Sequence, residues 1–235
     1  MIQKEKLDAV AVVTPDFLHR EIALEVASHG IHLLMEKPLD TSVKGAQKMV
    51  QAAKENNVLL FVDFHKRFDP AYINLKKQIQ EGKLGKVQYG YIWMEDKIVV
   101  PSVWFKNWAK YSSPAWFIGI HFFDMLIWIF GSIQAIEVYA TESTRTSGRL
   151  ELEHATVNWR LSINQEDLPC QCIDMGQTTY RSIAVDGNEI EFSHGFTDLH
   201  TRVYEEILAG RGFSIIDAQP SIQLVPDIRH AKPLC

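Results

Sequence analysis

Three short apolar runs near the amino terminus, separated by segments with helical spacing, constrain the fold of this chain more than any other feature. The runs are Leu7–Val13, Ile31–Met35 and Val58–Val62. Each is short and followed by a polar turn, which is typical of strands buried on both faces of a parallel sheet. Apolar residues recur at helical spacing between them, over residues 16–29 and 41–56. This alternation predicts right-handed βαβ units and a parallel α/β sheet.

The rest of the chain alternates strand-like runs with helical segments in a different order. Asp69-Pro70 opens a helix, and Asp186-Gly187 is a hairpin signal. Strands that pair through turns, with helices on one side, predict an α+β domain with an open, mainly antiparallel sheet. We place the boundary near residue 65, which gives domains of residues 1-64 and 65-235. The predicted strands are 86–94, 135–141, 154–161, 180–186 and 189–193, and the predicted helices are 70–81, 115–130, 197–209 and 217–230.

Composition and charge narrow the classes of function. The formal net charge is -5, which favours neither nucleic acid nor an anionic membrane surface as a partner. The chain has 3 cysteines, and so sparse a set fits a reducing compartment, so we expect a cytoplasmic protein. Cys170 and Cys172 form only a weak C-x-C signal for metal. Polar residues interrupt the apolar segment 116–130, which we interpret as a buried helix and not a membrane span.

The segments that follow the three apolar runs hold an unusual density of basic and imidazole side chains. These segments are residues 14–19, 35–38 and 63–68. Ligands of open parallel sheets bind outside the carboxyl ends of the strands. We therefore expect the three segments to line one crevice, to which they contribute His19, Lys37, His65, Lys66 and Arg67.

The order of motifs in these segments resembles that of the Gfo/Idh/MocA oxidoreductases. A T-P-x-x-x-H turn, an E-K-P motif and an R-F-x-P segment each follow one predicted strand, and a G-x-H-x-x-D-x-x-x-W pattern comes later. Any one of these motifs is weak, whereas the ordered set is specific. The resemblance implies hydride exchange between NAD or NADP and a small-molecule sugar or polyol. The matching positions are Thr14-Pro15 with His19, Glu36-Lys37-Pro38, Arg67-Phe68 with Pro70, and Gly119, His121 and Asp124 with Trp128.

Lys37 is the first catalytic candidate. In the family that this chain resembles, the lysine of E-K-P hydrogen-bonds the reacting oxygen and helps to move its proton. Oxidation of an alcohol requires a proton acceptor, and a lysine whose pKa is lowered by burial or by a neighbouring cation can serve. A cis Lys37–Pro38 bond would turn the lysine into the crevice. The alternative for Glu-Lys-Pro alone is an ordinary surface turn.

His121 is the second catalytic candidate. Asp124 follows it by about one helical turn, so that its carboxylate can orient the imidazole or bind substrate. The alternative is a satisfied core histidine on an apolar helix. The family usually carries an aspartate four residues before this histidine, where this chain has Phe117. This departure puts the usual acid–base relay in doubt.

The remaining site assignments also follow from the resemblance. We assign His65 to substrate binding, although an amide side chain often stands there in the family. Trp104 and Trp108 are candidates for an aromatic wall against a sugar ring, with a core or interface role as the alternative. Arg67 has a structural ion pair as its alternative, and His19 has helix capping. No residue is assigned to a metal, and the residues assigned to the cofactor are Thr14, Pro15, His19, Glu36, Lys37, Pro38 and Arg67.

The chain contains no G-x-G-x-x-G turn, with which a dinucleotide fold brings the pyrophosphate to a helix N-terminus. Leu7–Val13 matches the family's fourth strand. We therefore interpret residues 1-64 as the carboxyl-terminal half of a Rossmann domain and residues 65-235 as the substrate-binding and oligomerisation domain. Tight dinucleotide binding by this chain alone is not expected. The residue that distinguishes NAD from NADP lies outside the sequence.

Three functions compete. The leading one is an NAD(P)-dependent dehydrogenase or reductase, which by analogy with the family forms a homo-oligomer, a dimer or a tetramer. The alternative is a truncated or non-catalytic relative that acts as a binding or oligomerisation module, which the missing glycine-rich turn and Phe117 favour. A metal-dependent hydrolase that uses His65, His121 and Asp124 is a third hypothesis, weakened by the lack of a compact ligand motif such as H-E-x-x-H.

Overall fold

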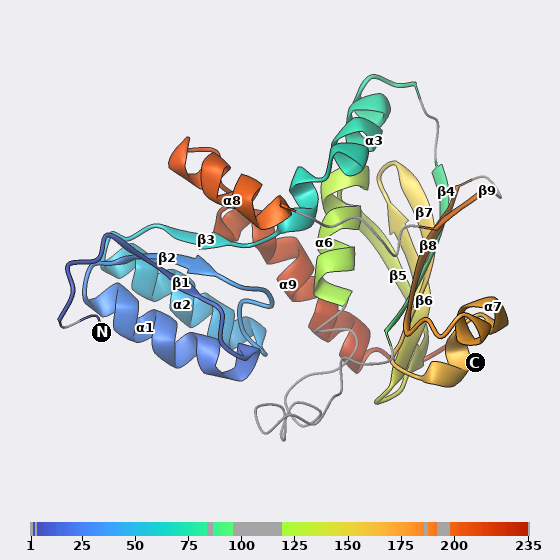
Figure 1. Ribbon diagram of the computed structural model, residues 1–235, viewed down its shortest axis with the longest axis horizontal. Helices are drawn as coiled ribbons and strands as arrows, with labels where there is room; N and C mark the ends of the chain where they lie inside the picture. The colour runs from blue at the N-terminus through green and yellow to red at the C-terminus, as the bar shows by residue number, and fades with distance from the viewer. Residues whose placement is uncertain are drawn as a thin grey trace.

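Two sheets stand on either side of a central group of helices in the computed structural model (Figure 1). The smaller sheet holds the amino-terminal strands, and the larger sheet holds strands from the second part of the chain. The helices between them come from the middle and from the end of the sequence. The structure describes residues 2, 4–83, 87–95, 119–185, 188–191 and 198–234.

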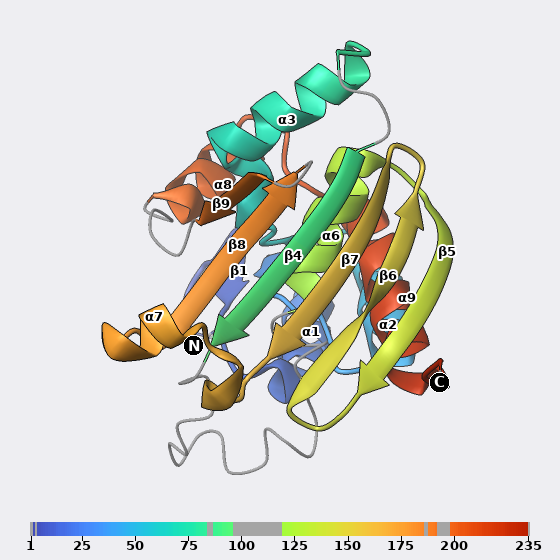
Figure 2. The ribbon, with the colours of Figure 1, turned by 90° about the vertical axis from the view of Figure 1, so that its right-hand side faces the viewer.

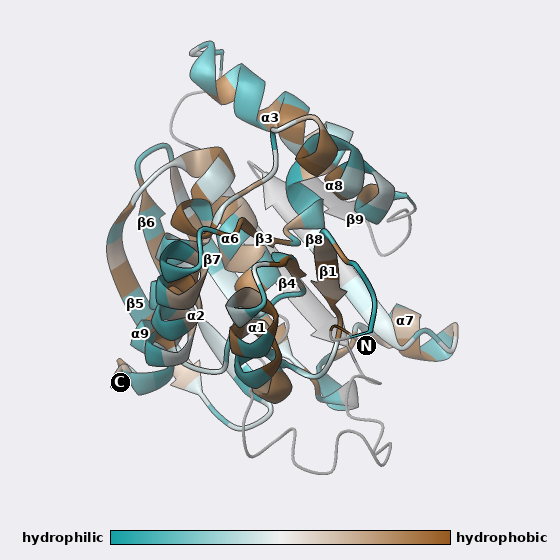
Figure 3. Ribbon diagram, turned by 90° about the vertical axis from the view of Figure 1, so that its left-hand side faces the viewer, coloured by the Kyte–Doolittle hydropathy of each residue, from teal (hydrophilic) through white to brown (hydrophobic). Residues whose placement is uncertain are grey.

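The smaller sheet is the predicted parallel unit. Its strands run in the order β1-β2-β3, and both neighbouring pairs are parallel. Helices α1 and α2 cover one face (Figure 1). β1 is an edge strand, drawn in apolar brown in Figure 3, and Val13 after it is 73% exposed. The elements are β1 (Ala9–Val12), α1 (His19–Ser28), β2 (His32–Met35), α2 (Val43–Glu55) and β3 (Leu60–Val62).

Local sequence signals account for the helix ends. The Ser42 hydroxyl caps α2 by accepting a hydrogen bond from the Gly45 backbone N–H at 3.0 Å. Gly30, with φ of +70°, ends the turn after α1 in a conformation that favours glycine. The helix predicted from residue 16 begins instead with the 3-10 helix η1 (Asp16–Leu18), and α1 starts at His19.

The larger sheet confirms the predicted fold class. Its six strands lie in the order β5-β6-β7-β4-β8-β9, and all neighbours are antiparallel except β4 and β7. In Figure 2 no helix or strand of the described residues lies in front of this sheet, and α3, α6, α8 and α9 lie behind it. The strands are β4 (Val87–Glu95), β5 (Ile133–Thr141), β6 (Arg145–Leu152), β7 (Ala155–Ser162), β8 (Thr179–Val185) and β9 (Asn188–Glu191).

Two segments of regular structure were not predicted. β6 alternates between exposed or half-exposed polar residues and buried ones, but its buried set includes Thr146 and Gly148 besides two leucines. This mixture hides the apolar alternation on which a strand prediction depends. The short helix α7 (Cys170–Asp174), which follows the 3-10 helix η4 (Gln165–Asp167), spans too few residues for a helical period to be recognised.

The apolar segment before residue 130 forms a buried helix, as predicted. In α6 (Gly119–Phe130), Ile120, Phe122, Phe123, Leu126 and Phe130 have no exposed surface. The helix packs against the larger sheet, where the Phe123 and Trp159 rings meet edge to face at 5.1 Å. None of the described helices is both long and apolar enough to cross a membrane.

The end of the chain returns to the smaller sheet. The Val62 N–H donates to the Phe213 carbonyl at 3.2 Å, and Phe61 forms an antiparallel bridge with Ser214. The carboxyl end of β3 therefore meets elements from both halves of the chain. These are the 3-10 helix η2 (His65–Phe68), α3 (Pro70–Gln80), α8 (Leu199–Leu208) and α9 (Ile215–His230).

Candidate functional site

The carboxyl ends of β1, β2 and β3 form one continuous rim. The Glu36 N–H donates to the Val12 carbonyl at 3.0 Å, and the Asp63 N–H donates to the Met35 carbonyl at 2.9 Å. These bonds align the three strand ends side by side, as expected for parallel strands. The three segments that the sequence singles out therefore meet at the same edge of the sheet.

His19 connects the first two rim segments. Its Nε2 lies 2.8 Å from the Thr14 carbonyl and its Nδ1 lies 2.9 Å from the Pro38 carbonyl. The side chain is buried, at 1% exposed. Both ring nitrogens are thus engaged with backbone, so His19 holds the Thr14 turn against the Glu36–Pro38 turn.

The Glu36-Lys37-Pro38 turn faces the histidines of the site. The Lys37–Pro38 peptide bond is cis, and Lys37 is half-buried. Besides burial, the positive charge of Lys37 lowers the pKa of His121 and of His65, which places the lysine within electrostatic range of both rings. Burial and the negative charge of Asp63 raise the pKa of Glu36, and Lys37 opposes that rise. Lys37 thus lies, half-buried, in the segment that follows β2 at this rim.

His65 and His121 form a buried imidazole pair. Their ring centroids lie 4.6 Å apart in an edge-on arrangement. Burial, together with neighbouring positive charges, lowers the pKa of His65 to about 3 and that of His121 well below its ordinary value. Both rings are consequently neutral at pH 7. Their Nδ1 atoms are buried without a hydrogen-bond partner among the described residues, so they are available to a ligand.

Asp63 and His200 are site residues that the sequence analysis did not assign. His200 begins α8 and its Nδ1 lies 2.7 Å from Asp63 Oδ2. Its ring centroid is 4.4 Å from that of His65. Burial raises the pKa of Asp63, and the His200 hydrogen bond and charge oppose the rise. No motif signals this contact, because the residues are 137 positions apart.

Arg67 and Asp124 form a buried ion pair. Arg67 donates from Nε to Asp124 Oδ2 at 2.7 Å and from Nη2 to Oδ1 at 2.6 Å. Arg67 Nη2 also donates to the Asp217 carbonyl, and the Ser221 hydroxyl donates to Asp124. Both members are less than 5% exposed as whole residues. Burial raises the pKa of Asp124, whereas Arg67 lowers it.

This pair corrects the assignments of two residues. The guanidinium of Arg67 is engaged inside the protein, so the structural alternative replaces its assignment to the cofactor. The Asp124 carboxylate is bonded to Arg67 and Ser221 and not to His121, so it neither orients that imidazole nor remains accessible for substrate. Its physical role is to join η2, α6 and α9 beneath the rim.

The rim also has features that suit a nicotinamide ribose. The Thr14 hydroxyl is buried and finds no hydrogen-bond partner within the described part of the chain, so it can accept or donate to a ligand. A cavity of about 250 Å³ lies against α8 and the smaller sheet. Its lining residues are Ala11, Val13, Leu34, Glu36, Asp63, His200 and Tyr204.

Five residues that the sequence analysis names lie outside the described residues. These are Trp104 and Trp108, the candidates for an aromatic wall, Phe117, which stands where the family usually has aspartate, and the hairpin signal Asp186-Gly187. Their assignments therefore stay predictions.

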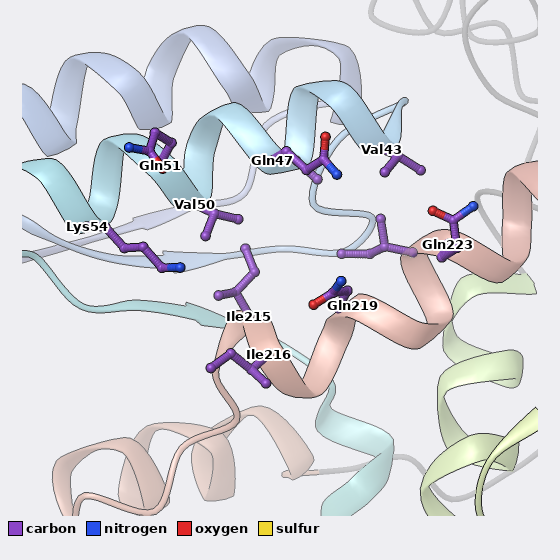
Figure 4. A pocket seen from close by; sticks show the side chains of 11 residues that line it. Val43, Gln47, Val50, Gln51, Lys54, Ile215, Ile216, Gln219 and Gln223 are labelled. Atoms are coloured by element: carbon purple, nitrogen blue, oxygen red, sulfur yellow. The ribbon is translucent and has the colours of Figure 1, made fainter.

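A separate hollow lies between α2 and α9 (Figure 4). Val43, Val50, Ile215 and Ile216 supply aliphatic surface there, and glutamines from both helices supply amides. Lys54 is its one charged lining residue among those described, and it shares no lining residue with the rim. This hollow therefore lacks the acid–base groups that the rim gathers.

Comparison with known proteins identifies the family. Residues 1–64 match the model described as "Oxidoreductase family, NAD-binding Rossmann fold", and residues 72–164 match the "GFO/IDH/MocA C-terminal domain". The WlbA (WbpB) dehydrogenase of Thermus thermophilus, solved in complex with NAD and alpha-ketoglutarate, has 33% sequence identity and a TM-score of 0.88. The alignment covers 99% of this chain and 75% of that one. This chain belongs to the Gfo/Idh/MocA oxidoreductase family.

Curated family members match over shorter stretches. The scyllo-inositol 2-dehydrogenase (NAD(+)) of Bacillus subtilis is 32% identical over 107 residues, which are 46% of this chain and 31% of the relative. The levoglucosan dehydrogenase of Pseudarthrobacter phenanthrenivorans is 30% identical over 141 residues, 58% of this chain and 36% of the relative. The matches thus span about a third of the length of these curated relatives.

Proposed function

We propose that this chain supplies the nicotinamide side and the substrate-binding part of an NAD(P)-dependent oxidoreductase that acts on a sugar or polyol. One observation carries the proposal. Lys37 stands at the meeting point of three parallel strand ends, within electrostatic range of two neutral buried imidazoles. Family membership gives this arrangement its chemistry, because the relatives include inositol and levoglucosan dehydrogenases.

Lys37 and His121 are the proposed catalytic residues. When bound, NAD or NADP supplies the acceptor or donor of the hydride. Lys37 hydrogen-bonds the reacting oxygen, takes its proton during oxidation of the alcohol, and returns the proton during reduction of the carbonyl. His121, neutral because burial lowers its pKa, can accept a hydrogen bond from the substrate hydroxyl and so orient it.

The other rim residues have proposed binding roles. Thr14, Pro15, Glu36 and Pro38 contact the nicotinamide ribose, and the unpartnered Thr14 hydroxyl supports this role. His19 contributes by fixing the two turns that carry these residues. His65 is proposed to bind substrate, with Trp104 and Trp108 as an aromatic wall against the sugar ring.

The organisation of the whole protein is also a proposal. We infer two domains, residues 1-64 and 65-235, which agrees with the separate family models at 1–64 and 72–164. A homo-oligomer, either dimer or tetramer, is supported by the larger sheet, one face of which no described helix covers (Figure 2). A sparse cysteine content supports a cytoplasmic location.

A binding or oligomerisation module without turnover is the second candidate. The missing glycine-rich turn and Phe117 favour it. The two candidates differ in whether the rim binds a dinucleotide once a pyrophosphate site is present.

The experiment is a fluorescence titration with NADH and NADPH. One sample is this chain, and the other is a fusion that joins, before Met1, the amino-terminal segment of Thermus thermophilus WlbA. We expect the fusion to bind a reduced dinucleotide at least about tenfold more tightly, because a phosphate cradle at a helix N-terminus is restored. Thr14→Val in the fusion should weaken binding about tenfold, for the loss of one buried hydrogen bond. A folded fusion that binds neither dinucleotide would contradict the oxidoreductase proposal and support the module.

A further inference from the structure

The rim gathers a set of ligand-type groups of which the proposed oxidoreductase function uses only His65. Asp63, His65 and His200 each offer one potential ligand atom, and these atoms all lie within 4.8 Å of one another. Asp63 Oδ2 and His200 Nδ1 are 2.7 Å apart, and Asp63 Oδ1 and His65 Nδ1 are 3.7 Å apart. Asp63 directly follows β3, His65 is the first residue of η2, and His200 lies in the first turn of α8.

Two of these atoms are buried without a hydrogen bond. Asp63 Oδ1 and His65 Nδ1 have no partner among the described residues, although the Asp63 side chain is only 6% exposed and that of His65 only 14%. An unsatisfied buried polar atom costs about 1–3 kcal/mol, so native structures rarely retain one without a reason. Two such atoms facing each other across 3.7 Å leave an opening in which an additional atom would satisfy both.

The donor set suits a particular class of ion. Two imidazole nitrogens and one carboxylate oxygen are typical ligands of a site for Zn²⁺ or a neighbouring divalent transition metal. Metal–ligand bonds of about 2.1 Å in a tetrahedron separate the ligand atoms by about 3.4 Å. The 3.7 Å between Asp63 Oδ1 and His65 Nδ1 is close to that value. His200 Nδ1 exchanges its 2.7 Å hydrogen bond with Asp63 Oδ2 for the ion when the metal binds.

Both positively and negatively charged side chains surround these three residues, and the Glu36 carboxylate lies on the side that the cavity opens. Lys37 and Lys66 place positive charge near His65, which weakens cation binding. Glu36 opposes that effect, and it lines the 250 Å³ cavity together with Asp63 and His200. This cavity leaves room for water or for the Glu36 carboxylate as a fourth ligand.

We propose that Asp63, His65 and His200 bind one divalent transition-metal ion, with Zn²⁺ as its physiological type. The ion links the amino end of α8 to the end of β3. This metal site goes beyond the proposed oxidoreductase function, and the proposal of the site does not depend on that function. It also differs from the hydrolase hypothesis, whose Asp124 is bonded to Arg67.

The test titrates the metal-free chain with Zn²⁺ by calorimetry and with Co²⁺ by visible absorption, in the absence of dinucleotide. We expect one ion per chain and a tetrahedral Co²⁺ spectrum without a thiolate band. Asp63→Asn and His200→Ala should each weaken binding at least about tenfold. His200 suits this purpose because its side chain is 55% exposed, so its removal spares the core. Bound Zn²⁺ should also raise the Tm of the wild-type chain, as any ligand of the folded state does.

His154→Ala is the matched control. His154 is 50% exposed and lies 3.7 Å from Glu153 on the surface, so it is an imidazole–carboxylate pair without a third ligand. Its removal should leave Zn²⁺ affinity unchanged. The proposal is overturned by an absence of Zn²⁺ binding to the wild-type chain, by equal affinities of the wild type and His200→Ala, or by a Co²⁺ thiolate band that assigns binding to cysteine. Because no dinucleotide is present, each of these results leaves the oxidoreductase proposal standing.

Discussion

Replacing Lys37 by alanine in the fusion with the WlbA segment should lower kcat by about 10²–10⁴-fold, the usual contribution of a positioned acid–base group. The alanine removes the donor to the reacting oxygen while the strand ends and the Thr14 turn remain in place. The dinucleotide Kd should therefore change by less than about threefold. Initial rates at saturating sugar and dinucleotide measure kcat, and fluorescence titration measures Kd.

Lys77→Ala supplies the control for that substitution. Lys77 is 70% exposed on α3, so its replacement removes the same positive charge at a distance from the chemistry. Its kcat should equal that of the unmodified fusion. Retention of most activity by Lys37→Ala would show that Lys37 does not move the proton, whatever the dinucleotide affinity.

Asp124→Ala should lower the free energy of unfolding of this chain by about 3–5 kcal/mol, because it leaves a buried guanidinium without its counter-charge. Arg67 is 4% exposed, and its Nε and Nη2 would each lose a carboxylate partner. Urea denaturation followed by circular dichroism measures the loss. Burial of the charge, and not the number of hydrogen bonds, sets the size of this effect.

Two further variants separate this mechanism from simple loss of packing. Glu206→Ala breaks the exposed pair with Arg211 and should change stability little, because solvent screens that pair. Combining Arg67→Met with Asp124→Leu removes both charges and should recover much of the stability that Asp124→Ala loses. If the double variant is no more stable than Asp124→Ala, the stability is lost through altered packing and not through the unpaired charge of Arg67.

Much of the fold could be predicted because local signals and packing agree in the amino-terminal third. The apolar runs, the Ser42 cap and Gly30 all specify the same parallel unit. β6 was not predicted, because its buried positions include Thr146 and Gly148. The sequence of this strand therefore lacks a regular alternation of apolar and polar residues. Prediction from a local apolar pattern fails wherever the folded structure accepts a small or polar residue at a buried position.

The sequence predicts those parts of the site that follow from strand order and short motifs, and not the contacts between residues far apart in the chain. The parallel sheet brings the Thr14, Lys37 and His65 segments to one rim, and this follows from strand order alone. The Arg67–Asp124 pair spans 57 positions and the Asp63–His200 pair spans 137, so no spacing rule reports them. Arg67 was consequently assigned to the cofactor, although the fold commits its guanidinium to a buried carboxylate.

The central claim is tested most directly by following the transferred hydrogen. NADH or NADPH carrying deuterium at the transferable position is incubated with the fusion and keto forms of inositols, anhydrosugars and nucleotide sugars, and each product is weighed by mass spectrometry. We predict that at least one product gains one deuterium on carbon, and that Lys37→Ala slows this gain by at least about 10²-fold. A fusion that binds the dinucleotide yet transfers no deuterium to any of these sugars would contradict the account.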